Sequence, residues 1–407
     1  MDASSALDAG SSRDASASDA SGSDAQTTHP DPECAEDGCL RAASKVGDFG
    51  RSFLEPYLEP GVRIENGYSV WTLEYVTDGA TSLATVTLPF AVDAPADGWA
   101  IVANDHGTSG VGDVCKLSGT VAGAGLAGLF GARGMIGVAT DYPGLGTPGV
   151  HPYLVSTVEG RATLDALRAA RNLAVWLRLP VSGRYAVVGL SQGGHAALAA
   201  AAEHASYAPE LDIRAFGASA PASVWEEQWR AGVMVDGPHL AFHALLVYAW
   251  AAHYGFSGPS LWADGLSGRI DSIMDSECVV PIPGAPTTLM ADLGERADAI
   301  FSAPFLRAYG SGDWGDFADF HSWFTLNRIG PYEQTAPLRI YQGDADTIVL
   351  EPGTRALVDD LRAGGVEVDY QVVPGGEHTT VAFGFVASDE LRTEESIAWI
   401  RGLVEAP

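Results

Sequence analysis

The stretch YAVVGLSQGGHAALAAAAEH, from Tyr185 to His204, places a serine between glycines where a strand pattern changes into a helix pattern. Small and β-branched apolar residues lead up to Gly189, and an alanine-rich segment follows Gly194. A serine on such a tight turn has strained backbone angles, and its hydroxyl projects into open space. The stretch therefore predicts that Ser191 is presented at the end of a buried strand. The other interpretation is a solvated serine in a glycine-rich turn, so the context must decide.

Strand and helix patterns alternate on both sides of this stretch. Alternation of this kind predicts a mostly parallel central sheet flanked by helices on both faces. The strand patterns are Gly67–Val92 (two strands with a turn at Asp78-Gly79), Trp99–Asp105, a run ending near Asp141, Ile213–Ala220, Leu338–Gln342 and Val366–Val373. The helix patterns are Glu159–Leu177, the segment after Gly194, about Pro352–Ala363, and a last run ending near Val404.

The alternation breaks between residues 222 and 332, which contain six of the ten tryptophans. We predict that this block is a helical cap inserted over the sheet. The core then consists of residues 45–221 and 333–407. The tryptophans either line an apolar pocket or pack the cap onto the core, since aromatic side chains dominate both environments.

Residues 1–44 have a different composition, rich in Ser, Asp and Ala with almost no large apolar side chains. We predict a disordered acidic leader. No apolar segment typical of a signal peptide follows Met1, but such leaders often come just after a cleaved export signal. The expected location is therefore secreted, periplasmic or cell-surface, with a cytosolic protein as the alternative.

The net charge of −29 argues against nucleic acid and anionic membranes as partners. No apolar run is long enough to cross a membrane. Cys34 and Cys39 are close enough for a small loop disulfide, and Cys115 and Cys278 would then form a second one, but four cysteines allow three pairings. Their spacing does not suit a metal site. The sequence does not indicate an oligomeric state.

A serine hydroxyl is a weak nucleophile, so it needs a general base that is oriented by a carboxylate. In α/β-hydrolase folds the acid and then the histidine follow the serine in the chain, at the ends of later strands. His378 follows the strand pattern Val366–Val373, and Asp344 and Asp346 follow Leu338–Gln342. Asp346 is favoured because it resembles the Gly-x-x-Asp spacing of such loops, and Asp344 is the alternative.

An oxyanion hole needs two preorganised N–H donors. The residue after the nucleophile, Gln192, supplies one. Gly107 or Thr108, after the strand Trp99–Asp105, is predicted to supply the other. Candidate substrate contacts are His106, Tyr142, His151 and Trp225, although a bracing role is the favoured interpretation of His106.

The segments DHGTSGVGDVC, ATDYPGLGTPGVHPYL, EGRATLDALRAAR, GLSQGG, GDADTIV and PGGEH together resemble the secretory lipase family of α/β-hydrolases. The resemblance runs from about Val46 to the C-terminus. It implies an α/β-hydrolase fold, hydrolysis of carboxylic esters or lipids, a Ser191-His378-Asp346 triad and a helical cap before the acid. It also favours a Cys115–Cys278 bridge. The acidic leader departs from the family pattern.

We therefore predict an esterase or lipase that works through an acyl-enzyme and needs no metal or cofactor. Its substrate is a small-molecule or lipid ester, and no stable membrane insertion is expected. An acyltransferase and a serine peptidase on the same fold are alternatives. A non-catalytic binding protein is a third alternative.

Overall fold

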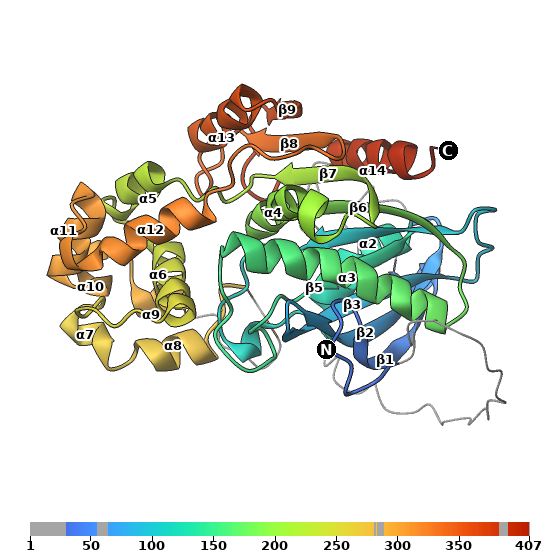
Figure 1. Cartoon of the computed structure of the whole chain (residues 1–407), viewed down its shortest axis with the longest axis horizontal. Coiled ribbons are helices and arrows are strands. Elements are labelled where there is room, and N and C mark those ends of the chain that lie inside the picture. Colours follow the sequence, from blue (N-terminus) through green and yellow to red (C-terminus); the bar gives the residue numbers. More distant parts are fainter. Residues whose placement is uncertain (1–29, 55–63, 281, 283–288, 382–389, 407) are drawn as a thin grey trace.

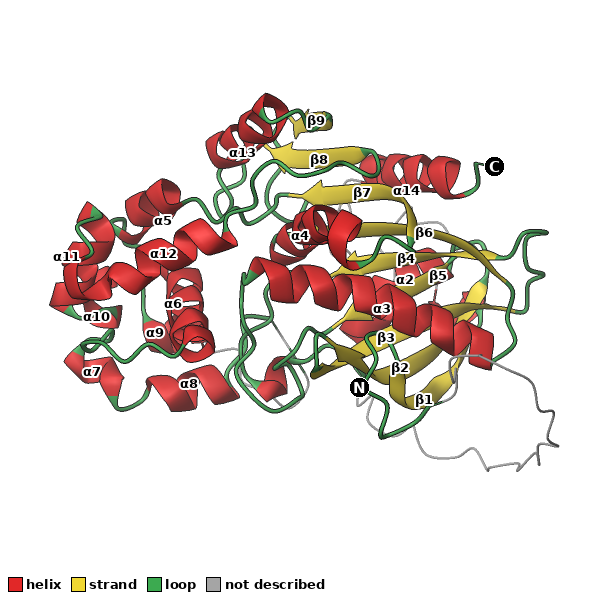
Figure 2. Ribbon diagram, viewed as in Figure 1, coloured by secondary structure: helices red, strands yellow, loops and turns green. Residues whose placement is uncertain are grey.

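The central feature of the structure is a sheet of nine strands (Figures 1 and 2). The computed structural model describes residues 30–54, 64–280, 282, 289–381 and 390–406. The strands are β1 (Leu40–Phe49), β2 (Gly67–Thr77), β3 (Ala80–Phe90), β4 (Trp99–Asp105), β5 (Ile136–Thr140), β6 (Val181–Leu190), β7 (Asp212–Ser219), β8 (Leu338–Gly343) and β9 (Val368–Val373). Their order across the sheet is β1-β2-β3-β5-β4-β6-β7-β8-β9.

The sheet has an antiparallel part and a parallel part. Strands β1, β2, β3 and β5 pair antiparallel, whereas β5, β4, β6, β7, β8 and β9 pair parallel. The carboxyl ends of the parallel strands therefore meet at one edge of the sheet, where ligands bind in open α/β folds. The strands expected from the sequence all form, and the mostly parallel sheet is confirmed.

Helices cover both faces of the parallel part. Alternate strand residues such as Ile101 and Val187 pack with helices α3, α4 and α13 on one face. Their neighbours Val102 and Val188 pack with α2 and α14 on the other. The helices of the core are α1 (Arg51–Leu54), α2 (Val121–Gly131), α3 (Ser156–Trp176), α4 (Gln192–Tyr207), α13 (Glu351–Ala363) and α14 (Glu390–Val404), with a 3₁₀ turn η2 (Asp113–Cys115).

Between β7 and β8 the described chain is helical, and we call this segment the cap. Its helices form a separate lobe beside the sheet in Figure 1. They are α5 (Glu226–Val233), α6 (Leu240–Tyr254), α7 (Asp264–Ser267), α8 (Ile270–Ser276), α9 (Leu289–Leu293), α10 (Ala297–Ile300), α11 (Ala303–Ser311), η3 (Gly315–Phe317) and α12 (Ala318–Asn327). None of the described helices is both long and apolar enough to cross a membrane.

The cap has an aromatic core of its own. Trp250 is fully buried and lies edge-on to Phe324, with ring centroids 5.0 Å apart. Trp314 and Trp323 are also buried, and each contacts Phe320. For Trp250 and Trp323 the structure favours packing over a pocket.

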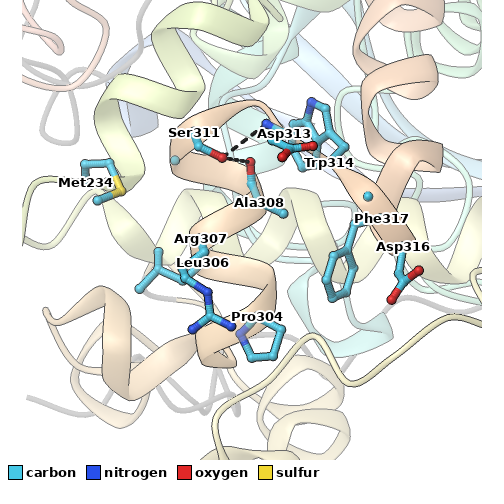
Figure 3. Close-up of a pocket in the computed structure, with 12 residues that line it drawn as sticks. Met234, Pro304, Leu306, Arg307, Ala308, Ser311, Asp313, Trp314, Asp316 and Phe317 are labelled. Atoms are coloured by element: carbon cyan, nitrogen blue, oxygen red, sulfur yellow. Dashed lines mark hydrogen bonds between the residues drawn. The ribbon is translucent and has the colours of Figure 1, made fainter.

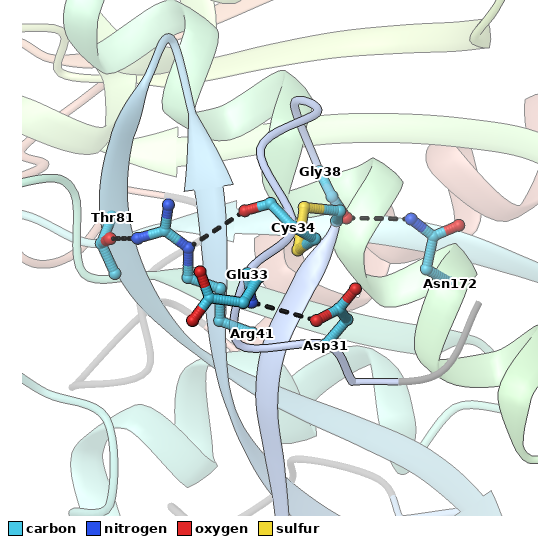
Figure 4. The surroundings of a disulfide bond; sticks show 8 residues. Asp31, Glu33, Cys34, Gly38, Arg41, Thr81 and Asn172 are labelled. Atoms are coloured by element: carbon cyan, nitrogen blue, oxygen red, sulfur yellow. Dashed lines mark hydrogen bonds between the residues drawn. A yellow bond between two sulfur atoms is a disulfide. The ribbon is translucent and has the colours of Figure 1, made fainter. Parts of the chain in front are cut away.

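The N-terminal segment departs from the sequence prediction. A disordered leader was expected through residue 44, but β1 begins at Leu40 and pairs with β2. A disulfide between Cys34 and Cys39 closes the turn before it (Figure 4). Asn172 of α3 donates a hydrogen bond to the Gly38 carbonyl at 2.9 Å. The disulfide and these backbone contacts order a segment whose side chains are too polar to form a core. Residues 1–29 lie outside the described part.

A second disulfide joins the core to the cap. Cys115, just before α2, is bonded to Cys278, just after α8, and 163 positions separate them in the chain. Both cysteines are fully buried. Nearby, the Val279 N–H donates to the Ser109 carbonyl at 2.8 Å. The loop after β4 is thus attached directly to the cap.

Candidate active site

Ser191 lies on a strained turn between β6 and α4. Its φ of 61° and ψ of −116° lie in a region that residues with a side chain rarely adopt. A methyl group added to Gly189 would lie 2.2 Å from the Gly193 carbonyl oxygen, and one added to Gly193 would lie 2.0 Å from that of Asp105. Only glycine fits at either position, which explains the spacing that surrounds the serine.

Backbone hydrogen bonds hold this turn against the next strand. The Ser191 N–H donates to the Ser219 carbonyl at 2.9 Å, and the Ala222 N–H donates to the Ser191 carbonyl at 3.1 Å. The Ser191 side chain is partly exposed. The turn is therefore fixed at the carboxyl ends of β6 and β7, with its serine reachable from solvent.

Asp346 and His378 form an ordered pair at the ends of β8 and β9. The His378 Nδ1 lies 2.8 Å from the Asp346 Oδ2. The other oxygen of Asp346 accepts the N–H groups of Ile348 and Val349 at 2.8 and 2.9 Å. Gln342 adds an amide donor to Oδ2 at 3.2 Å. Because a carboxylate only accepts hydrogen bonds, Nδ1 of His378 carries a proton, so Nε2 is the acceptor nitrogen of the neutral ring.

Asp344, the alternative acid, has a different role. It is exposed, and its Oδ1 accepts the Gly375 N–H at 2.6 Å. This bond links the loops that follow β8 and β9. Asp346 is 4% exposed and contacts the histidine directly. Asp346 rather than Asp344 therefore lies beside His378, and its role as the catalytic acid stays a prediction.

The predicted oxyanion-hole residues lie on two segments beside Ser191. A methyl group added to Gly107 would lie 3.4 Å from the Leu190 carbonyl oxygen and 3.6 Å from the Ser191 Cβ. Gln192 is the first residue of α4, so its N–H has no acceptor within the helix. The Thr108 hydroxyl is 2.9 Å from the Tyr153 hydroxyl, which anchors this loop to the segment before α3.

Three of the predicted substrate contacts form one buried stack. The ring centroids of His106 and Tyr142 are 4.8 Å apart, and Tyr142 stacks on His151 at 5.4 Å. All three side chains are at most 2% exposed. Burial lowers the pKa of His106 to about 4, so this imidazole is neutral at physiological pH. The three rings therefore pack against one another with almost no exposed surface. Contact with substrate stays a prediction for all three, and so does the bracing role favoured for His106.

Trp225, the fourth predicted contact, lies at the junction of core and cap. It immediately precedes α5 and is only partly buried. The Arg328 guanidinium lies 4.0 Å from the centre of its ring. Trp225 stays a candidate for contact with substrate.

Sequence reasoning missed one group beneath the turn. Glu159 of α3 is fully buried, and its Oε2 is 2.6 Å from the His195 Nδ1 of α4. Its Oε1 accepts the Gln192 side-chain amide at 2.8 Å. Burial alone would raise the pKa of Glu159, but the attraction of the neighbouring His195 is the largest opposing cause, and the pKa is lowered to about 2. The sequence signal was the acidic residue of the EGRA segment, Glu159. Its position in a helical pattern is typical of an ordinary carboxylate in the first turn of a helix.

A hollow of about 730 Å³ lies on the cap, along α11 and the turn after it (Figure 3). Met234, Arg307 and Trp314 are among its lining residues. None of the predicted site residues lines it. Among the described residues, no three His, Cys, Asp or Glu side chains gather into a group that could hold a metal ion.

The sheet, the serine turn and the acid–histidine pair define the α/β-hydrolase fold. A protein from Legionella pneumophila that is proposed to be a hydrolase superposes with a TM-score of 0.75 at 21% identity, covering 89% of this chain and 98% of its own. The rice cell wall degrading esterase LipA from Xanthomonas oryzae gives 0.74 at 18% identity, over 91% and 98%. Candida antarctica lipase A in its closed state gives 0.63 at 19% identity, over 85% and 78%.

The sequence model of the secretory lipase family matches residues 124–227, which include the serine turn. No curated protein is significantly similar in sequence. The match and the shared fold support a carboxylic ester hydrolase. The same match and the disulfides Cys34–Cys39 and Cys115–Cys278 indicate an extracellular protein.

Proposed function

We propose that this protein hydrolyses carboxylic esters through a Ser191-His378-Asp346 triad and an acyl-enzyme intermediate. The observation that carries the proposal is the hydrogen bond between His378 and Asp346 at the ends of β9 and β8. Ser191 stands on a strained turn at the end of β6, near the same edge of the sheet. A partly exposed serine, a histidine whose Nδ1 faces a carboxylate, and that buried carboxylate are the three groups that acyl transfer needs.

In the first half-reaction the Ser191 Oγ attacks the ester carbonyl carbon while the His378 Nε2 takes its proton. The carbonyl π electrons move to oxygen, and the N–H groups of Gln192 and of Gly107 or Thr108 stabilise this oxyanion. The intermediate then collapses, the C–O bond to the alcohol breaks, and the imidazolium protonates the departing oxygen.

In the second half-reaction water takes the place of Ser191 as the nucleophile and attacks the acyl-enzyme by the same series of steps. His378 takes a proton from water, the hydroxide attacks the acyl carbon, and the bond to Ser191 breaks with return of the proton. Asp346 keeps the Nδ1 proton in place throughout and stabilises the positive imidazolium. The carboxylic acid is released, and the serine is regenerated.

The substrate is a small-molecule or lipid ester, and we infer that its apolar part meets the junction of core and cap near Trp225. Secretion, or export to a periplasm or cell surface, suits a hydrolase with two disulfides and a net charge of −29. No observation favours an acyltransferase, a peptidase or a non-catalytic binding protein over hydrolysis.

The test is hydrolysis of p-nitrophenyl esters with C2 to C16 acyl chains by the wild type and by Ser191→Ala. We expect turnover in the wild type and a loss in kcat on the order of 10⁶ in the variant, as when other serine hydrolases lose their nucleophile. A fluorophosphonate should label the wild type at Ser191 only. Equal turnover in both proteins, or a wild type that neither turns over nor reacts, would overturn the proposal.

Two further assays separate the alternatives. An added alcohol that captures most of the acyl group would point to an acyltransferase. A p-nitroanilide cleaved as fast as the ester would point to a peptidase.

A further inference from the structure

Glu159 of α3 contacts two segments, the loop just before its own helix and the first turn of α4, which lies more than 30 residues further along the chain. It accepts the backbone N–H of Leu154, in the loop before α3, at 2.8 Å. It also accepts the amide of Gln192 at 2.8 Å and lies 2.6 Å from the His195 Nδ1, both in the first turn of α4. His151 lies 3.6 Å away. One carboxylate thus ties the loop and the start of α4 to α3.

The hydrogen-bond directions in this cluster follow from the acceptors. The His151 Nδ1 is 3.1 Å from the Pro143 carbonyl, which can only accept, so Nδ1 carries the proton. In the neutral ring the His151 Nε2 then accepts, and the Gln192 Nε2 lies 2.6 Å from it. The Gln192 amide therefore uses one hydrogen for His151 and the other for Glu159.

These bonds fix the orientation of Gln192. If its amide were turned over, its oxygen would face the Glu159 carboxylate and the His151 lone pair, which are both acceptors. Glu159, His151, Gln192 and His195 are all at most 1% exposed, so water cannot replace a lost partner cheaply. The cluster therefore holds Gln192 in one position.

We propose that Glu159 is a positioning residue that acts through Gln192 to aim the Gln192 backbone N–H at the reacting carbonyl oxygen. This inference rests on the proposed function. The side chain of Gln192 is held on the α3 side, so its backbone N–H keeps a fixed direction at the start of α4. Glu159 itself does not touch the substrate.

The informative substitution is Glu159→Gln, which keeps the size of the side chain. One oxygen becomes an NH₂ group. Facing the Leu154 N–H or the Gln192 amide, it meets a donor. Facing His195, it requires the ring to move its proton from Nδ1 to Nε2, which is buried with no hydrogen-bond partner among the described residues. A displaced Gln192 N–H weakens the oxyanion hole without removing it. Losing a whole donor costs about 10²–10³ in rate, so we expect kcat to fall about 10- to 100-fold with KM changed less than about threefold.

If Glu159 only stabilised the fold, its substitution would not lower kcat while leaving KM nearly unchanged. A transition-state analogue separates positioning from stability more sharply. A trifluoromethyl ketone with the acyl chain of the preferred ester forms a tetrahedral oxyanion on a serine. Its inhibition constant should rise in Glu159→Gln by the same factor by which kcat/KM falls. Glu203→Gln is the matched control because Glu203 also bridges α4 to α3, by an ion pair with Arg161, but is partly exposed. We expect its kinetics to be unchanged.

Variants of His195 cover the case in which Glu159→Gln fails to fold. His195→Asn keeps an N–H near the position of Nδ1 and should retain kcat within about threefold, whereas His195→Leu should lose it as Glu159→Gln does. Gln192→Ala, which keeps the backbone N–H but not its clamp, should lose kcat similarly. Combining it with Glu159→Gln should add little further loss, since both act through one contact.

The results distinguish this proposal from the proposed function. An inactive, unlabelled wild type would contradict ester hydrolysis itself. An active wild type with unchanged kcat and analogue affinity in folded Glu159→Gln, or equal kcat in His195→Asn and His195→Leu, would overturn the positioning role.

Discussion

The core and the cap are built on different physical constraints. In the core, backbone segments approach so closely that single positions admit only glycine, as at Gly189 and Gly193. In the cap, aromatic rings such as those of Trp250, Phe320 and Trp323 pack against one another through broad apolar contacts. The first kind of contact tolerates no substitution, whereas the second accepts many side chains of similar volume.

Short sequence motifs locate functional residues only in the core. Steric constraints at the strand ends fix both the residue types and their spacing, so the residues that form the motif also include the candidate catalytic residues. In the cap, volume and hydrophobicity are enough, and neither identifies which ring meets a substrate. We therefore expect substitutions of the strand-end residues Asp346 and His378 to affect chemistry, and removal of the link between core and cap to affect stability.

The largest effect should come from the core pair at the ends of β8 and β9. Asp346→Asn leaves a side chain of the same size but offers His378 an N–H or a neutral oxygen in place of a carboxylate. The imidazole then loses its fixed tautomer, and we expect kcat to fall about 10⁴-fold, as in other triads. Steady-state kinetics on the preferred p-nitrophenyl ester measure this effect.

Asp344→Asn is the matched control, because Asp344 belongs to the same loop and accepts only the Gly375 N–H. Its kcat should stay within a few fold of the wild type. Comparable losses in the two variants would show that the loop as a whole matters, rather than the bond between Asp346 and His378.

Much of the core was predictable from sequence, and the reason is local. Apolar runs such as Trp99–Ala103 and Tyr185–Val188 form strands because both their faces are buried. The chain order of Ser191, Asp346 and His378 then places the three residues at strand ends. Predicting the strands needed only residues close together in the sequence, and placing the three residues at strand ends needed only the general topology of parallel sheets.

The features of the fold and the site that the sequence did not predict depend on contacts between segments that are distant in the chain. Glu159 looks like a first-turn helix carboxylate, and only the packing of α3 on α4 turns it into a buried anchor. The polar segment before Leu40 looks unable to fold, but its disulfide and its hydrogen bonds to α3 and β2 order it. Burial of Tyr142 and His151 likewise follows from packing that no local pattern encodes.

The second-largest effect should come from the link between core and cap. Removing the Cys115–Cys278 disulfide with paired Cys→Ser substitutions frees a loop with a sequence separation of 163, compared with 5 for Cys34–Cys39. The chain-entropy relation gives a loss in unfolding free energy of about 5 kcal/mol for the first and about 2 kcal/mol for the second. Guanidinium unfolding followed by tryptophan fluorescence measures both.

The Cys34→Ser/Cys39→Ser variant serves as the control for the general effect of replacing a disulfide with two serines. Tryptophan fluorescence reports strongly on the cap, where Trp250, Trp314 and Trp323 are buried. Equal losses in the two double variants would mean that the attachment of cap to core does not depend on its disulfide.

The smallest effect concerns the loop that carries the core end of this link. Asp141, just after β5, accepts the N–H groups of Leu117 and Ser118 at 2.7 and 2.9 Å, close to Cys115. Burial raises the pKa of Asp141 to about 6, above its ordinary value of 3.8. Its carboxyl group therefore keeps a proton in the folded protein at pH values where the unfolded chain has lost it. The resulting stabilisation is complete below pH 3.8 and disappears as the pH rises through 6.

Asp141→Asn removes this pH dependence because an amide does not titrate. The stability of the variant relative to the wild type should rise between pH 4 and pH 7 by up to about 3 kcal/mol, from about 1.4 kcal/mol per pKa unit, and then stay level. Thermal unfolding of both proteins across that range measures the difference. Burial also raises the pKa of Asp165 to about 6. Because Asp165 is present in both proteins, its contribution cancels in the difference in their stability. A difference that is constant with pH, or that falls, would mean that Asp141 is ionised in the folded protein and that the loop carrying Cys115 is held by a charged carboxylate.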